Sequence, residues 1–143
     1  IYAITHNPIV ALLGVFLWST SGAPWTMDYG LYIAVVSLGS LGFEIGRKIR
    51  LPDEELDGVE SYSSVLGRAR ADRLLMGTRW VTAILLSWLA FRADHWPIVS
   101  LSLVFAAVTH SLLFRHTLKA KAVEGVATVM LLLDFLLVWG LGW

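Results

Sequence analysis

The chain contains no cysteine, so it can form neither a disulfide framework nor a thiolate metal site. Charged side chains are scarce as well, at 15% of the 143 residues, against about a quarter in an ordinary soluble domain. The formal net charge is zero, which argues against a basic surface for nucleic acid. What remains is mostly apolar, at 57% of residues with a mean hydropathy of +0.68. We therefore expect an all-α, polytopic membrane protein.

Five apolar segments approach the length needed to cross a hydrocarbon core of about 30 Å. They cover residues 8–20, 29–45, 76–93, 96–114 and 122–143. A long charged loop at 46–75, with a basic lead-in at 69–75, joins the second segment to the third, and the later connections are short. We predict a single membrane domain of five transmembrane helices.

Lysine and arginine gather on one side of such a bundle. Ten of them, Arg79 included, flank the loop 46–75 or lie in the turn 115–121, and Arg92 alone falls on the other side. Basic loops remain in the cytoplasm during membrane insertion. We expect an integral protein of the bacterial inner membrane, with the charged loop in the cytoplasm and the C-terminus outside.

The charged loop carries an acidic run in which Asp53 and Asp57 have the spacing DxxxD. On an α-helix, residues four apart share a face, with about 5–6 Å between their Cβ atoms. A pair of carboxylates there, together with substrate phosphates, is typical of Mg²⁺ binding. Arg47, Lys48 and Arg50 precede the run and would hold such phosphates. The alternative is a solvated loop of mixed charge.

Two short segments carry a family resemblance. Residues 44–50 (EIGRKIR) and 58–63 (GVESYS), with Gly67, resemble the second acidic motif region of the UbiA-type intramembrane prenyltransferases. In that family the region joins helices six and seven of nine, so the five segments would correspond to helices five to nine, half of the bundle. The motif match covers about 25 residues of the 143, although the topology fits nearly the whole chain.

The resemblance implies a function and a set of site residues. Family members use Mg²⁺ to transfer a prenyl group from an isoprenyl diphosphate to an aromatic or other lipophilic acceptor. By this resemblance the metal ligands would be Asp53 and Asp57, with Glu44 and Glu54 as alternates, and the diphosphate would lie against Arg47, Lys48, Arg50 and Tyr62.

The family's first acidic motif, roughly NDxxDxxxD, has no counterpart in these residues. We therefore expect the chain to be the C-terminal half of a longer enzyme, or to be completed by a partner chain. The alternative is a non-catalytic, UbiA-like subunit that packs in the lipid against other subunits of a membrane complex.

Two polar residues lie within apolar segments, Asp134 in 122–143 and His110 in 96–114. Ionisable groups inside a bilayer are costly and are functional candidates by default. The alternative is that the two residues pair with each other and only hold helices together. Gly39, Gly42 and Gly46 have the small-residue spacing that predicts close helix packing.

Overall fold

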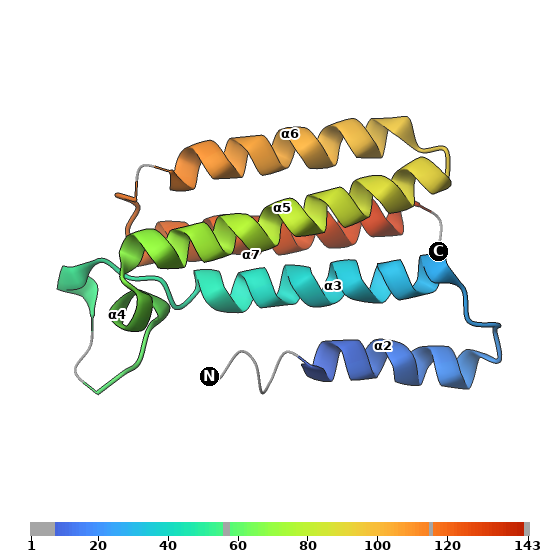
Figure 1. The fold of residues 1–143 in the computed structure, drawn as a ribbon, viewed down its shortest axis with the longest axis horizontal. Helices are drawn as coiled ribbons and strands as arrows, with labels where there is room; N and C mark the ends of the chain where they lie inside the picture. Colours follow the sequence, from blue (N-terminus) through green and yellow to red (C-terminus); the bar gives the residue numbers. More distant parts are fainter. Residues whose placement is uncertain (1–7, 56–57, 115, 142–143) are drawn as a thin grey trace.

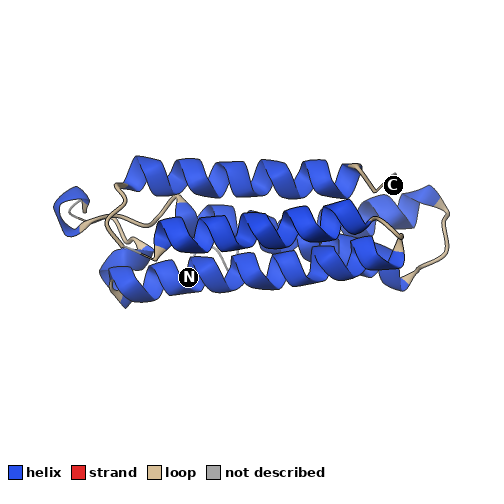
Figure 2. Ribbon diagram, turned by 90° about the horizontal axis from the view of Figure 1, so that it is seen from above, coloured by secondary structure: helices blue, strands red, loops and turns tan. Residues whose placement is uncertain are grey.

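The computed structural model describes residues 8–55, 58–114 and 116–141, and within these ranges it contains helices and loops but no strand (Figures 1 and 2). The elements are α2 (Pro8–Ser21), α3 (Met27–Gly46), the 3₁₀-helix η1 (Pro52–Glu54), α4 (Tyr62–Leu66), α5 (Arg68–Arg92), α6 (Trp96–Leu113) and α7 (Ala120–Trp139). In this part of the chain, α3, α5, α6 and α7 are long and apolar enough to cross a membrane, and α2 is apolar but shorter. The protein is thus a helical membrane protein, and the count of five spans stays a prediction.

Helix α5 begins earlier than the apolar pattern indicates. The sequence places the third span at 76–93 after a separate basic lead-in, whereas the helix runs without a break from Arg68. The break falls instead at Gly67, which ends α4 with a φ of +79°, a left-handed conformation that glycine adopts readily. The charged linker between α3 and α5 is therefore residues 47–67.

Helix α3 lies at the centre of the arrangement and packs against α2, α5 and α7, while α6 packs mainly on α5 (Figure 1). Two apolar clusters fill the interior. The first lies toward the charged linker and includes Ile45, Leu75 and Val123. The second lies toward the opposite end and includes Val35, Leu86 and Leu137. A polar layer separates these clusters, and it contains a buried ion pair.

The glycines of α3 allow its backbone to approach its neighbours closely. A Cβ atom at Gly46 would lie only 2.4 Å from the Cβ of Ala127 on α7. Cβ atoms at Gly39 and Gly42 would lie 3.3 Å from Asp134 Oδ2 and 3.3 Å from Thr78 Oγ1. The close helix packing predicted from the small-residue spacing is confirmed.

Large apolar side chains cover the outside of the bundle. Examples are Phe16 on α2, Val104 on α6 and Leu136 on α7, each at least 59% exposed. Apolar residues all round a helix are typical of a helix surrounded by lipid. The outer surface thus agrees with membrane insertion.

Candidate functional site

Three charged residues gather at the C-terminal end of α3, Glu44 in its last turn and Arg47 and Lys48 just after it. Arg47 Nε lies 2.6 Å from Glu44 Oε2, and Lys48 Nζ lies 2.9 Å from Glu44 Oε1. The pairs are three and four residues apart, the spacings that bring helical side chains together. This α3 charge cluster has two cations and one carboxylate, and hence a net charge of +1. The Arg47 side chain is 42% exposed, so the cluster is accessible.

Tyr62 lies beside this cluster. Its backbone N–H donates to the Lys48 carbonyl at 3.0 Å, which fixes the start of α4 against the end of α3. Burial raises the pKa of the Tyr62 phenol, and the negative charge of Glu44 raises it further. Tyr62 is therefore a protonated phenol at neutral pH and can donate a hydrogen bond to an anion.

Arg50 has different contact partners from Arg47 and Lys48. Its guanidinium Nη1 donates to the Glu54 carbonyl at 3.4 Å, and its backbone N–H donates to Ser63 Oγ at 2.8 Å. These bonds hold the first half of the linker against α4. Of the predicted diphosphate-binding residues, the structure therefore brings together Arg47, Lys48 and Tyr62. Arg50 instead stabilises the fold of the linker.

The acidic run is not on an α-helix, contrary to the expectation from the DxxxD spacing. Helix η1 ends at Glu54, and Glu55 has an extended backbone with φ −67° and ψ 139°. The Glu54 side chain accepts a hydrogen bond from the Leu51 N–H at 3.1 Å, which closes the 3₁₀ turn begun at Pro52. Asp53 thus lacks the continuous helix that would align it with residue 57. Asp57 itself lies outside the described residues.

Glu54 acts instead as a cap for a distant helix. Its Oε2 accepts a hydrogen bond at 2.8 Å from the backbone N–H of Ala120, the first residue of α7. The first N–H groups of a helix lack partners within it, and a carboxylate there also interacts favourably with the helix dipole. Hydrogen bonds from Leu51 and Ala120 hold the pKa of the Glu54 carboxyl below its usual value.

The described carboxylates do not fit a Mg²⁺ site. No group of three His, Asp or Glu residues that could hold a metal occurs in the described ranges. Glu44 is engaged by two cations, Glu54 by two backbone N–H groups, and Asp53 is exposed. The predicted metal role of Asp53, Asp57, Glu44 and Glu54 would need carboxylates from outside this part of the chain.

Acid is expected to weaken the attachment of the linker to α7. Because the folded-state pKa of Glu54 lies below 4.5, its contribution to stability is present above pH 4.5 and is lost as the pH falls through that lower pKa. Glu54→Gln should therefore lower the thermal midpoint at pH 7, and the difference from the parent protein should disappear in acid. Glu60→Gln, at an exposed linker position, is the control; a midpoint unaffected by Glu54→Gln at pH 7 would contradict the capping role.

Inside the bundle, Asp134 on α7 forms an ion pair with Arg79 on α5. Arg79 is 2% exposed, and its guanidinium also lies over the ring of Phe105 on α6, 4.8 Å from the centroid. The alternative that Asp134 pairs with His110 is wrong, because Asp134 pairs with Arg79 and His110 Nδ1 accepts a hydrogen bond from Trp80 Nε1 at 3.2 Å. Arg79 likewise does not flank the charged loop, and it must be removed from the charge count for that side.

A second buried carboxylate, Asp72, was not recognised from the sequence. It is fully buried near the start of α5, where its Oδ2 lies 2.8 Å from Arg68 Nε and 2.8 Å from His116 Nδ1. Arg68 Nη2 also donates to the Leu118 carbonyl at 2.9 Å. The cluster ties α5 to the connection before α7. The four-residue spacing of Arg68 and Asp72 could have indicated it.

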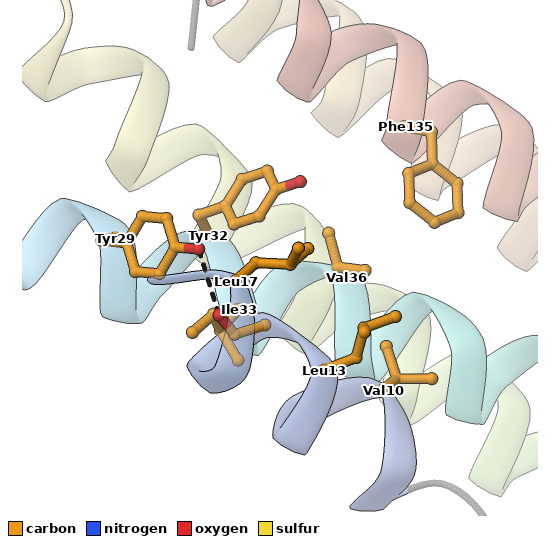
Figure 3. Close-up of a pocket in the computed structure, with 9 residues that line it drawn as sticks. Val10, Leu13, Leu17, Tyr29, Tyr32, Ile33, Val36 and Phe135 are labelled. Carbon is orange, nitrogen blue, oxygen red and sulfur yellow. Dashed lines mark hydrogen bonds between the residues drawn. The ribbon is translucent and has the colours of Figure 1, made fainter. Parts of the chain in front are cut away.

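An apolar pocket of about 500 Å³ lies between α2, α3 and α7 (Figure 3). Its lining residues are Val10, Leu13, Gly14, Leu17, Tyr29, Tyr32, Ile33, Val36 and Phe135. Tyr29 donates a hydrogen bond from its hydroxyl to the Gly14 carbonyl at 3.1 Å, which attaches α2 to α3 on one side of the pocket. Figure 1 shows α2 beside the half of α3 that lies away from the linker.

The pocket and the α3 charge cluster share one face of α3. Arg47 follows Val36 by three helical turns, which places both on the same side of the helix, about 16 Å apart along its axis. An elongated ligand with a charged head and an apolar tail would match this arrangement.

No family model, curated protein or solved structure matches the chain.

Proposed function

We propose that the chain is the diphosphate-binding half of a UbiA-like membrane prenyltransferase, which transfers a prenyl group from an isoprenyl diphosphate to an aromatic or other lipophilic acceptor. The observation that carries the proposal is the shared face of α3. A cluster with net positive charge lies at one end of this face, and an apolar pocket of about 500 Å³ lies further along it. An isoprenyl diphosphate has the same two parts, an anionic head and a long apolar tail.

In this proposal Arg47 and Lys48 bind the diphosphate, and Tyr62 donates a hydrogen bond to it. Glu44 holds the two cations side by side before the ligand arrives. Negative charge grows on the departing diphosphate as its bond to the prenyl carbon breaks. Cations positioned in advance lower the energy of that state more than they lower the energy of the bound substrate.

Residues outside the described part of the chain are proposed to complete the Mg²⁺ site. The described residues do not gather a Mg²⁺ ligand set, so acidic residues of another segment or of a partner membrane subunit would complete it. We also propose that the charged linker lies in the cytoplasm of a bacterial cell, with the C-terminus outside. The linker and the start of α5 support this orientation because Arg47, Lys48, Arg68, Arg70 and Arg73 all lie there.

Neutralising the two cations is expected to weaken diphosphate binding. The double variant Arg47→Gln/Lys48→Gln should bind geranylgeranyl diphosphate about 100- to 10,000-fold more weakly than the parent chain in detergent micelles, because it loses two charge-assisted hydrogen bonds worth about 1.5–3 kcal/mol each. Equilibrium binding of the radiolabelled diphosphate measures this. The control is Arg70→Gln/Arg73→Gln, which removes the same charge from exposed positions of α5 and should have little effect.

The same assay separates the enzyme proposal from its alternative. If the parent chain, alone and in its native membrane assembly, binds no diphosphate, the non-catalytic subunit becomes the better account. Equal weakening by both double variants would mean non-specific attraction to basic residues. In the native assembly, Mg²⁺-dependent turnover that survives Asp53→Asn/Asp57→Asn would remove these two residues from the metal site.

A further inference from the structure

The guanidinium of Arg79 is not satisfied by the groups around it. One of its nitrogens, Nη1, donates to Asp134 Oδ1, and the ring of Phe105 faces the cation. Nε and Nη2 are buried and have no hydrogen-bond partner among the described residues. Unpaired N–H groups on a buried charge are strongly unfavourable, so a further partner is expected at this place.

A small cavity with polar groups of Thr78, Arg79 and Asp134 in its lining adjoins the pair. Its volume is about 10 Å³, and its lining residues are Leu38, Gly39, Gly42, Thr78, Arg79, Thr82, Met130 and Asp134. A cavity of this size holds about one water molecule, and water remains in such a place when two to four polar partners surround it. Glycines at two lining positions keep the space open, since Cβ atoms at Gly39 and Gly42 would lie 3.3 Å from Asp134 Oδ2 and Thr78 Oγ1.

We infer that this cavity is a binding site for a single water molecule in the centre of the bundle. The water accepts a hydrogen bond from Arg79 and donates to Asp134 and to the hydroxyl of Thr78. Thr78 Oγ1 gives its own proton to the Leu75 carbonyl at 2.8 Å, so its lone pairs are available to accept. The water links α5 with α7 next to the glycines of α3. The site is independent of the proposed function.

Hydroxyl-radical footprinting of the intact protein in micelles tests this site, because radiolysis of a bound water oxidises side chains beside it. Met130 lines the cavity and Met76 does not, although both are buried, at 4% and 6% exposure. We expect Met130 to be oxidised several-fold faster than Met76, with the exposed Met27 as the reference for bulk water. Oxidation of Met130 no faster than that of Met76 would overturn the inference.

A cavity-filling variant gives the matched control. Gly42→Ala places a methyl group against Thr78 Oγ1 and should reduce the oxidation rate of Met130 to that of Met76. Gly125→Ala adds a methyl group on α7 where no atom lies within 4 Å, and it should leave the rate unchanged. Fast oxidation of Met130 in a folded Gly42→Ala protein would contradict the assignment, and the comparison in the parent protein decides the matter if that variant does not fold.

Discussion

Replacement of Asp134 by leucine is expected to lower the free energy of unfolding by about 3–5 kcal/mol, because removing one partner of a buried ion pair leaves the other charge uncompensated. The remaining charge would be that of Arg79, which is 2% exposed in the centre of the bundle. It could not reach water without disturbing α5. Reversible unfolding of the purified protein in mixed micelles, followed by circular dichroism, measures the loss.

Two further variants isolate the role of the pair. In Arg79→Met/Asp134→Leu both charges are absent, and most of the lost stability should return because apolar groups of similar volume replace a buried pair at little cost. Asp28→Asn weakens an ion pair of the same type, in which Arg92 Nε lies 2.5 Å from Asp28 Oδ1, but both side chains are partly exposed. That substitution should cost less than about 1 kcal/mol. An Asp134→Leu protein no less stable than Asp28→Asn would show that the buried pair contributes nothing.

Gly46→Ala is expected to destabilise the contact between α3 and α7 by about 1–3 kcal/mol, the usual cost of overpacking. The added Cβ would lie 2.4 Å from the Cβ of Ala127, a short side chain that cannot rotate away. The two helices would have to move apart, and the apolar cluster around Ile45 and Val123 would loosen. The same unfolding measurement gives the size of the effect.

The chain provides both a control and a rescue for this substitution. Gly125→Ala adds a methyl group where no atom lies within 4 Å, so it should stabilise α7 by up to about 1 kcal/mol through helix propensity. Ala127→Gly removes the methyl group that the new Cβ of Gly46→Ala would overlap. The double variant Gly46→Ala/Ala127→Gly should therefore be more stable than Gly46→Ala alone. A double variant as unstable as Gly46→Ala would mean that the destabilisation arises elsewhere.

The charged linker shows how far local patterns predict a site. Glu44, Arg47 and Lys48 have the spacing at which helical side chains meet, and the structure places them in contact, although their interpretation as metal and diphosphate ligands did not include this ion-pair cluster. The DxxxD spacing predicts a helix that the structure does not contain, because Pro52 and the Glu54 carboxylate close a 3₁₀ turn and Glu55 is extended. Local spacing predicts side-chain contacts only where the backbone between the residues is regular.

Asp134 shows that the sequence alone does not identify an ion-pair partner that is distant in the chain. Its position inside an apolar run marks it as a residue that needs a partner, but the run does not say which partner. Arg79 lies 55 positions away in the chain, and the contact depends on how α5 and α7 are rotated about their axes. Glu54 is a similar case, since its bond to the Ala120 N–H requires the linker to fold back onto the start of α7.

The sequence by itself determined that this protein is helical and lies in a membrane, where most of its helices begin and end, and that the glycines of α3 lie in close helix contacts. Hydropathy, helix length and residue size act over neighbouring positions, so these properties can be found in the order of the residues. Only the tertiary structure decided that Arg79 neutralises Asp134, that Glu54 caps α7, and that the α3 charge cluster shares a face with an apolar pocket. These features depend on the rotation and approach of whole helices, which are set by the packing of all the side chains together.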